Sequence, residues 1–321
     1  MATSPAAHTT GIDAAKREDQ TAPRIPWPRR LAAGLMLPRE HGAWAMLLMP
    51  YLVGTLAAGW GGWPSFLLLV AVLLLFSASR PLEVALQSSA RPREPKGAGA
   101  GLSPARAGDY GGEMRERSHR ALVHLSAYLG LGGGAGLLLL VVFQRWDLLA
   151  LGLASGAALA LQLPLKRQRL DRGRPARLLS IAALSATGPA AYYAASGMLD
   201  RHAAAVWGLA FLYSAAGLFY VRLIYQPPAR LKLETPQRLR ARAGRQMAAY
   251  LAVATLAVAG LTAFGWMPPL AGLALLPTIA KAAWAWAKPE YRPTLKQVGL
   301  TEIGHSSLFA LLAVVAIVAW R

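Results

Sequence analysis

Nine long apolar segments, separated by polar gaps, follow one another along most of the chain. They cover approximately residues 42–60, 64–80, 121–143, 147–165, 177–198, 203–224, 246–265, 267–287 and 299–320. Each is about 17–23 residues long, which as a helix matches the roughly 30 Å of hydrocarbon in a bilayer. The apolar runs are continuous and do not alternate with polar residues. They therefore predict an all-α, polytopic membrane helix bundle with about nine transmembrane helices.

Two segments lack this apolar pattern. Residues 1–36 contain Ala, Thr, Pro and charged residues without periodicity, and they predict a disordered cytosolic tail. No apolar core follows the early charges, so we do not expect a signal peptide. Residues 88–119 are rich in Gly, Pro, Ser and Arg and predict a flexible cytosolic loop. We expect the remaining residues, 37–321, to form a single transmembrane domain.

The positive charges predict the orientation of the chain. Of the 34 Lys and Arg residues, all except Arg145, Arg201 and Arg321 fall in the N-terminal tail or in every second gap between the apolar segments. Cytosolic loops of membrane proteins carry such an excess of Lys and Arg. The bias places the N-terminus inside the cell and the C-terminus outside it, and it supports an odd number of spans.

Composition agrees with this topology. The chain of 321 residues is 55% hydrophobic and only 15% charged, with a formal net charge of +19. The basic residues lie between apolar spans and not within one soluble domain, so we expect no nucleic-acid partner. Loops of this kind face the anionic inner leaflet, which predicts contacts with the bilayer and with anionic lipid head groups. The absence of cysteine excludes disulfides, thiolate nucleophiles and cysteine-ligated metals.

Ionisable residues at the edges of the apolar segments are the candidates for a functional pocket, because each is costly in a membrane unless it is paired or hydrated. On the predicted topology all of them lie in the cytosolic half of their helices, where they would line one polar pocket open to the cytosol. They are Glu40, His41, Arg80, Glu83, His124, Arg222, Lys281, Glu302 and His305.

Each candidate also has a structural interpretation. Arg80, Arg222 and Lys281 can extend to lipid phosphates from helix ends. Glu83 follows Arg80 by three residues, which favours a local helical ion pair. His124 can be a hydrogen-bonded packing residue.

The spacing of Glu302 and His305 puts both on one helix face. This arrangement is compatible with a metal site, with proton handling or with packing. One Glu-x-x-His copy is insufficient for a metal centre, and we expect no metal. Elsewhere, Gly152 and Gly156 form a GxxxG pair, for which we expect close helix packing.

No Walker sequence, G-x-S-x-G or H-E-x-x-H identifies a reaction, so the catalytic residues, the cofactor and the question of enzymatic activity stay open. The run Pro38-Arg39-Glu40-His41-Gly42-Ala43-Trp44-Ala45-Met46 resembles the opening signature of the YwiC-like family of bacterial integral membrane proteins. Arg80-Pro81-Leu82-Glu83 and Glu302-Ile303-Gly304-His305 fit this resemblance. It implies a multi-pass protein of the bacterial inner membrane without implying an activity.

The topology is also similar to that of UbiA-type prenyltransferases, which hold magnesium and a prenyl diphosphate with two Asp-rich motifs. The corresponding positions here carry Arg80-Pro81-Leu82-Glu83-Val84 and Val221-Arg222-Leu223-Ile224-Tyr225, without an Asp pair, and the chain contains no Asn. The resemblance therefore implies that magnesium chemistry is lost or replaced, while basic residues there could bind an anionic head group directly.

Three functions are compatible with these patterns. The first is handling of an anionic or isoprenoid lipid at the cytosolic polar pocket. The second is proton-coupled or small-solute transport through Glu83, Glu302 and His305, and the third is a non-catalytic role in membrane assembly. The sequence does not predict the substrate, the pathway or the oligomeric state.

Overall fold

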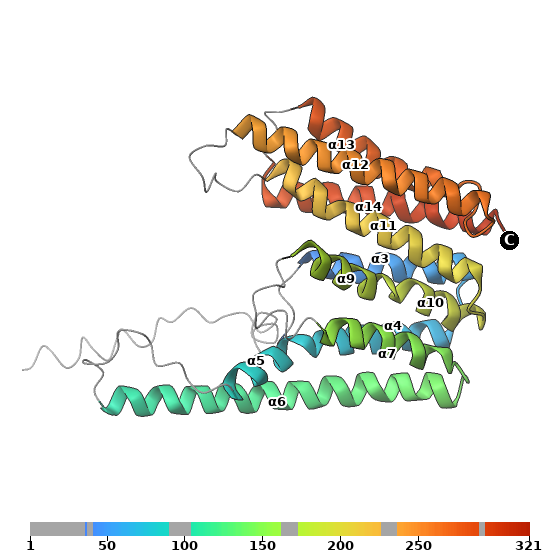
Figure 1. The fold of residues 1–321 in the computed structure, drawn as a ribbon. Helices are drawn as coiled ribbons and strands as arrows, with labels where there is room; N and C mark the ends of the chain where they lie inside the picture. The colour runs from blue at the N-terminus through green and yellow to red at the C-terminus, as the bar shows by residue number, and fades with distance from the viewer. Residues whose placement is uncertain (1–35, 37–40, 90–103, 162–172, 226–235, 289–292) are drawn as a thin grey trace, which may run out of the picture. The chain divides into compact units, whose positions relative to one another are not determined.

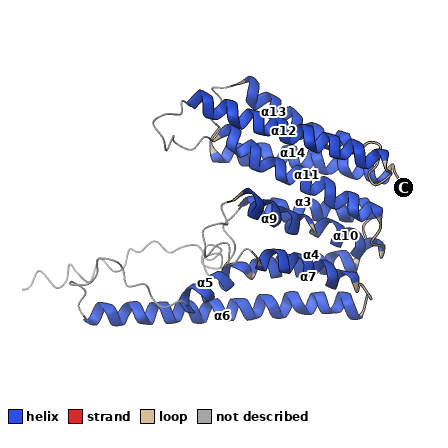
Figure 2. Cartoon of the chain, viewed as in Figure 1, coloured by secondary structure: helices blue, strands red, loops and turns tan. Residues whose placement is uncertain are grey.

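The computed structural model describes residue 36 and residues 41–89, 104–161, 173–225, 236–288 and 293–321. Within these ranges the protein consists of helices and short connections, without a strand (Figure 2). The predicted all-α fold is therefore confirmed for this part of the chain. Of the predicted tail of residues 1–36, only residue 36 is described. Of the predicted loop of residues 88–119, residues 90–103 lie outside the described residues, whereas residues 88–89 and 104–119 belong to helices.

The helices are labelled as in Figure 1. They are α3 (His41–Ala58), α4 (Trp63–Ser77), α5 (Ser79–Ser89), α6 (Pro104–Val141), α7 (Asp147–Ala160), α9 (Arg174–Ser185), α10 (Thr187–Ser196), α11 (Arg201–Ile224), α12 (Pro236–Ala263), the 3-10 helix η1 (Ala271–Leu275), α13 (Leu276–Ala287) and α14 (Leu295–Val318). The chain divides into two compact units, and α6 belongs to both. The described helices of the first unit fall within Arg80–His124, and the second unit comprises Pro38–Ser79 and Leu125–Arg321.

Six helical segments of the described chain are long and apolar enough to cross a membrane. They are Trp63–Leu86, Ser118–Val141, Arg174–Ser196, Arg201–Ile224, Arg238–Ala263 and Gln297–Val318. Ala43–Ala58 and Asp147–Ala160 are shorter apolar helices. At 1.5 Å per residue the 14 residues of α7 extend about 21 Å, less than a typical hydrocarbon core. The ninth predicted span, 267–287, is divided between η1 and α13, and the count of nine stays a prediction.

The surfaces of these helices are apolar. Leu131, Leu153, Leu256 and Phe264 are 65% to 81% exposed, and many other large hydrophobic side chains are exposed as well. In water such a surface would be strongly unfavourable, whereas in a bilayer it contacts acyl chains. The exposed hydrophobic side chains therefore support a lipid environment for the helices.

Small residues bring α3 and α10 together, and α3 packs more extensively on α10 than on any other described helix. A Cβ added to Gly54 would collide with the backbone of Gly188, and Gly188 is itself closely covered by Pro50 and Val206. Because no side chain separates the two backbones, the helices approach as small-residue motifs allow in membranes. By contrast, a Cβ added to Gly152 or Gly156 would meet no described atom within 4 Å. The prediction of close helix packing at the GxxxG pair is therefore wrong for the described residues of a single chain.

The span that contains α9 and α10 is bent between the two helices. Pro189 has no N–H, so it cannot donate the helical hydrogen bond to the carbonyl of Ser185. The Thr187 hydroxyl donates hydrogen bonds of 2.9 Å to the carbonyls of Leu184 and Leu47. The bond to Leu47 links the junction of α9 and α10 to α3.

Short links connect the helices at one end of the second unit (Figure 1). Trp60, Trp63, Trp146 and Trp266 lie at these links and are 58% to 72% exposed. Tryptophan prefers the interface between the hydrocarbon and the head groups. The exposed tryptophans therefore have the arrangement of an interfacial aromatic belt at this end.

Candidate functional site

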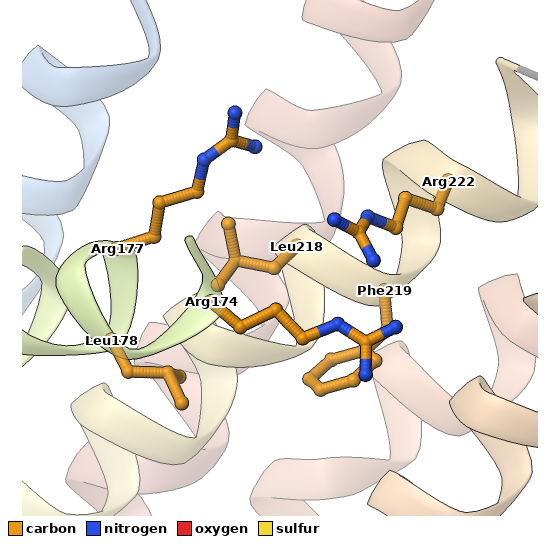
Figure 3. A pocket seen from close by; sticks show the side chains of 6 residues that line it. All are labelled: Arg174, Arg177, Leu178, Leu218, Phe219 and Arg222. Atoms are coloured by element: carbon orange, nitrogen blue, oxygen red, sulfur yellow. The ribbon is translucent and has the colours of Figure 1, made fainter. Parts of the chain in front are cut away.

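A small hollow between α9 and α11 gathers three arginines over an apolar floor (Figure 3). It is lined by Arg174, Arg177, Leu178, Leu218, Phe219 and Arg222. The space between these side chains is about 280 Å³, part of it open to the surroundings. We call these six residues the arginine hollow.

The ends of two helices position the arginines. α9 begins after Gly173, which has an extended backbone, and Pro175 lies in the first turn, where its missing N–H has no cost. Arg174 and Arg177 are therefore one turn apart at the start of α9. Arg222 lies in the last turn of α11. The first turn of α9 and the last turn of α11 thus come together although about 45 residues separate them in the sequence.

Neighbouring side chains hold Arg174 in place. Its guanidinium donates a hydrogen bond of 2.6 Å to Oε1 of Gln246 on α12. It also lies over the Phe219 ring, 5.9 Å from the ring centre, as a cation–π pair does. Phe219 in turn stacks on Tyr250, with ring centres 4.6 Å apart. The floor of the hollow is therefore an aromatic stack shared by α11 and α12.

The positive charge of the hollow is not neutralised by the described protein. Arg174 and Arg177 are close enough for their charges to act unfavourably on Arg222. None of the described ion pairs includes any of these three arginines. All three are exposed. Like charges without a counterion favour binding of an anion, and guanidinium groups bind phosphate or carboxylate through two parallel hydrogen bonds.

A second polar centre lies between α13 and α14. Nζ of Lys281 is 2.9 Å and 3.0 Å from the two carboxylate oxygens of Glu302. The Lys281 side chain is only 2% exposed, whereas that of Glu302 is 35% exposed. Two rings of α11 cover the ammonium, with distances of 5.3 Å to the centre of Tyr213 and 4.8 Å to the centre of Tyr220. The buried cation is therefore paired and surrounded by aromatic faces.

The two polar centres occupy opposite faces of α11. Tyr220 faces Lys281, and Arg222 faces the arginine hollow. Residues two positions apart on a helix point about 200° apart. Within the second unit, Arg222 and Lys281 thus belong to separate centres.

The remaining candidates make local contacts. In the first unit, Arg80 and Glu83 form the predicted i,i+3 ion pair at 3.1 Å, and Nδ1 of His124 lies 2.8 Å from the carbonyl oxygen of Arg120. In the second unit, Nδ1 of His305 lies 2.6 Å from the carbonyl oxygen of Thr301. Both histidines are thus bonded one turn back along their own helix, as packing histidines are. These contacts leave the predicted single pocket untested.

The opening motif is only partly visible. Glu40 lies outside the described residues, and His41 begins α3 without a described side chain. Among the described residues, no group of three or more His, Asp or Glu side chains is arranged to hold a metal ion.

The sequence did not single out Arg174 and Arg177, which were only two of many basic residues in a cytosolic gap. Their i,i+3 spacing at the start of an apolar helix was the signal that could have indicated them.

The sequence analysis also missed a third cluster of polar side chains, which lies at the opposite end of α11. There the Asp200 carboxylate caps α11 by accepting hydrogen bonds from the backbone N–H groups of His202 and Ala203.

The Asp200 carboxylate also pairs with the His202 ring, at 2.9 Å from Nδ1. Partial burial alone would raise the pKa of Asp200. The bonds from His202 and Ala203 outweigh this effect, and the pKa lies below its ordinary value.

The described helices define the class of this chain: a multi-pass helical membrane protein whose charged side chains gather at helix ends and in one buried pair. Over residues 37–192 the chain matches the family model described as YwiC-like protein, so this part of the chain is similar to that family. This confirms the resemblance of the opening motif. The match runs from the start of α3 into α10, so it includes Arg174 and Arg177 and ends before Arg222. No curated protein and no solved structure matches the chain.

Proposed function

We propose that this protein is a nine-span protein of the bacterial inner membrane that binds an anionic or isoprenoid amphiphile from the cytosolic leaflet through the arginine hollow. The N-terminus lies in the cytosol and the C-terminus outside. The distribution of Lys and Arg supports this orientation. The arginine hollow then faces the cytosolic head groups, because it lies at the opposite end of α11 from the short links.

The observation that carries the proposal is the change from charged to apolar side chains along both helices that line the hollow. On α9, which runs away from the cytosol, Leu178 follows the two arginines. On α11, which runs toward the cytosol, Leu218 and Phe219 precede Arg222. Both helices therefore present guanidinium groups at their cytosolic ends and apolar side chains on the deeper side, within about one turn of the arginines. An amphiphile has the same order of polar head and apolar chain.

Binding would proceed by displacement of water and not by chemistry. An anionic head group accepts hydrogen bonds from Arg177 and Arg222, while Arg174 keeps its bond to Gln246 and offers its remaining N–H groups. The first carbon atoms of the ligand then lie on Phe219 and the two leucines. No step of a reaction is assigned to these residues.

The test is retention of lipid by the purified full-length protein, measured by native mass spectrometry. Phosphatidylglycerol and phosphatidylcholine are supplied in equal amounts. We expect retention of phosphatidylglycerol and an at least tenfold loss in the double variant Arg177→Gln/Arg222→Gln. The matched control is Arg238→Gln/Arg242→Gln, which removes the same charge from exposed positions of α12 outside the hollow. Equal loss in both variants, or no retention by the wild type, would contradict the proposal.

A second candidate, proton-coupled transport, rests on the buried Lys281–Glu302 pair, since charged residues inside a membrane are frequent parts of transport pathways. Toward the other end of the unit, however, Tyr213 stacks on Phe309 at 4.1 Å, and an apolar cluster that includes Leu209 and Ile317 follows. A proton route needs polar groups or water, so the described residues favour lipid binding. A proton flux into liposomes that is present in the wild type and absent in Lys281→Met would favour transport over lipid binding.

A further inference from the structure

The number of arginines in the hollow indicates more about the ligand than the sign of its charge. We infer that the arginine hollow is built for an amphiphile with a terminal phosphate, that is, a phosphate monoester, in preference to a phosphodiester lipid. This inference rests on the proposed function and names the ligand class of the same site.

The first argument is charge. Three guanidinium groups line the hollow, and no described carboxylate pairs with them. A phosphodiester brings one negative charge. A phosphate monoester brings between one and a half and two at pH 7, because its second pKa is about 6. Only the monoester approaches neutralisation of three mutually repelling arginines.

The second argument is the number of oxygen acceptors. A phosphodiester presents two non-bridging oxygens, whereas a terminal phosphate presents three. Arg174 and Arg177 approach from α9 and Arg222 approaches from α11, so the donors come from two sides of the hollow (Figure 3). Three guanidinium groups can each engage one of the three oxygen edges of a terminal phosphate, while a diester has a single such edge and leaves two arginines without one.

The third argument is the floor of the hollow, which separates a lipid from a free phosphate. Leu178, Leu218 and Phe219 offer apolar area next to the arginines, and Phe219 is held rigidly by its stack on Tyr250. A water-soluble phosphate gains nothing from this surface. An acyl or isoprenoid chain can contact this apolar surface and the surrounding hydrocarbon at the same time.

The experiment measures binding of the full-length protein, in detergent micelles, to phosphatidic acid and to phosphatidylglycerol at equal concentrations. At pH 7.5 we expect phosphatidic acid to bind at least tenfold more tightly. At pH 5.5 the phosphate monoester has lost most of its second charge, so the preference should fall several-fold while phosphatidylglycerol binding stays constant. No described histidine or carboxylate lines the hollow, so this pH dependence belongs to the ligand.

The variants and competitors separate the possible failures. Arg177→Gln/Arg222→Gln should lose the preference, whereas Arg238→Gln/Arg242→Gln should keep it, with equal thermal stability showing that both fold. Equal binding of the two lipids would overturn the inference and leave the proposed function standing. Binding of neither lipid would overturn both. Displacement of phosphatidic acid by glycerol 3-phosphate at similar concentration would show that the ligand is a free phosphate, which overturns the assignment to a lipid.

Discussion

The Lys281–Glu302 pair predicts an unequal response to removal of its two partners. Lys281 is 2% exposed and Glu302 is 35% exposed. In Glu302→Gln the ammonium group stays buried without its counterion. In Lys281→Met the remaining carboxylate is partly exposed, so polar surroundings can stabilise it. We therefore expect Glu302→Gln to lower the free energy of unfolding more than Lys281→Met does.

The magnitudes follow from the surroundings of the ammonium. Removing one partner of a buried pair costs about 3–5 kcal/mol. The faces of Tyr213 and Tyr220 offset about 1–2 kcal/mol of this in Glu302→Gln. A net loss of about 2–3 kcal/mol remains. For Lys281→Met we expect a loss of about 1 kcal/mol, because the carboxylate that remains is partly exposed. The double variant Lys281→Met/Glu302→Gln buries no unpaired charge, and it should lie within about 1 kcal/mol of the wild type.

The assay is reversible unfolding of the purified protein in mixed micelles, followed by circular dichroism, with the four proteins forming a double-mutant cycle. The double variant should be more stable than Glu302→Gln alone, which is an effect that only a direct interaction gives. Losses that simply add in the double variant would refute the reasoning, as would Lys281→Met being the more damaging change.

Three further predictions concern packing, the third cluster and the topology. Gly54→Leu should lower the free energy of unfolding by several kcal/mol because the new side chain would collide with Gly188. Gly152→Leu meets no described atom near its Cβ and should change the free energy of unfolding by less than about 0.5 kcal/mol. The same unfolding assay checks both variants. Asp200→Ala should cost about 1 kcal/mol at pH 7 by removing the cap of α11. Because the pKa of Asp200 is lowered in the folded protein, its contribution is present above the ordinary value of 3.8 and is lost as pH falls through the folded value, so wild type and Asp200→Ala should converge in acid. Alkaline phosphatase fused to the C-terminus should be active and green fluorescent protein fused there should be dark, and the reverse would exclude an external C-terminus.

The agreement between sequence and structure follows the range of the interactions involved. The Arg80–Glu83 pair was predictable because helix geometry alone places residues three apart on one face. The helices themselves were predictable because continuous apolar runs in a bilayer must satisfy their own backbone. The Lys281–Glu302 pair was not predictable, since it joins two helices. The sequence analysis listed both residues as candidates for one polar pocket, but the sequence contained nothing that specified their contact.

Close helix packing is a second case in which the sequence did not specify a contact between helices. A glycine pair indicates that two helices could approach closely, without indicating which helices do so. Gly152 and Gly156 have the GxxxG spacing and meet no described atom within 4 Å, whereas Gly54 and Gly188 form a close approach from distant parts of the chain. Helix crossing angles and rotations decide between these outcomes, and hydropathy is nearly insensitive to them.

The position of α11 explains why the polar centres occur where they do. Half of the apolar window in Arg201–Ile224 is buried inside the protein, compared with 17% for Arg238–Ala263 and 28% for Gln297–Val318. A charged group that faces lipid is costly, so a helix covered on several sides by other helices can carry polar contacts on more than one face. α11 contributes the aromatic cover of Lys281 on one face and the arginine hollow on the other. Both centres thus depend on α11 but lie on different faces of it. For this reason, a substitution confined to the Lys281 centre should change the stability of the protein without changing its lipid preference.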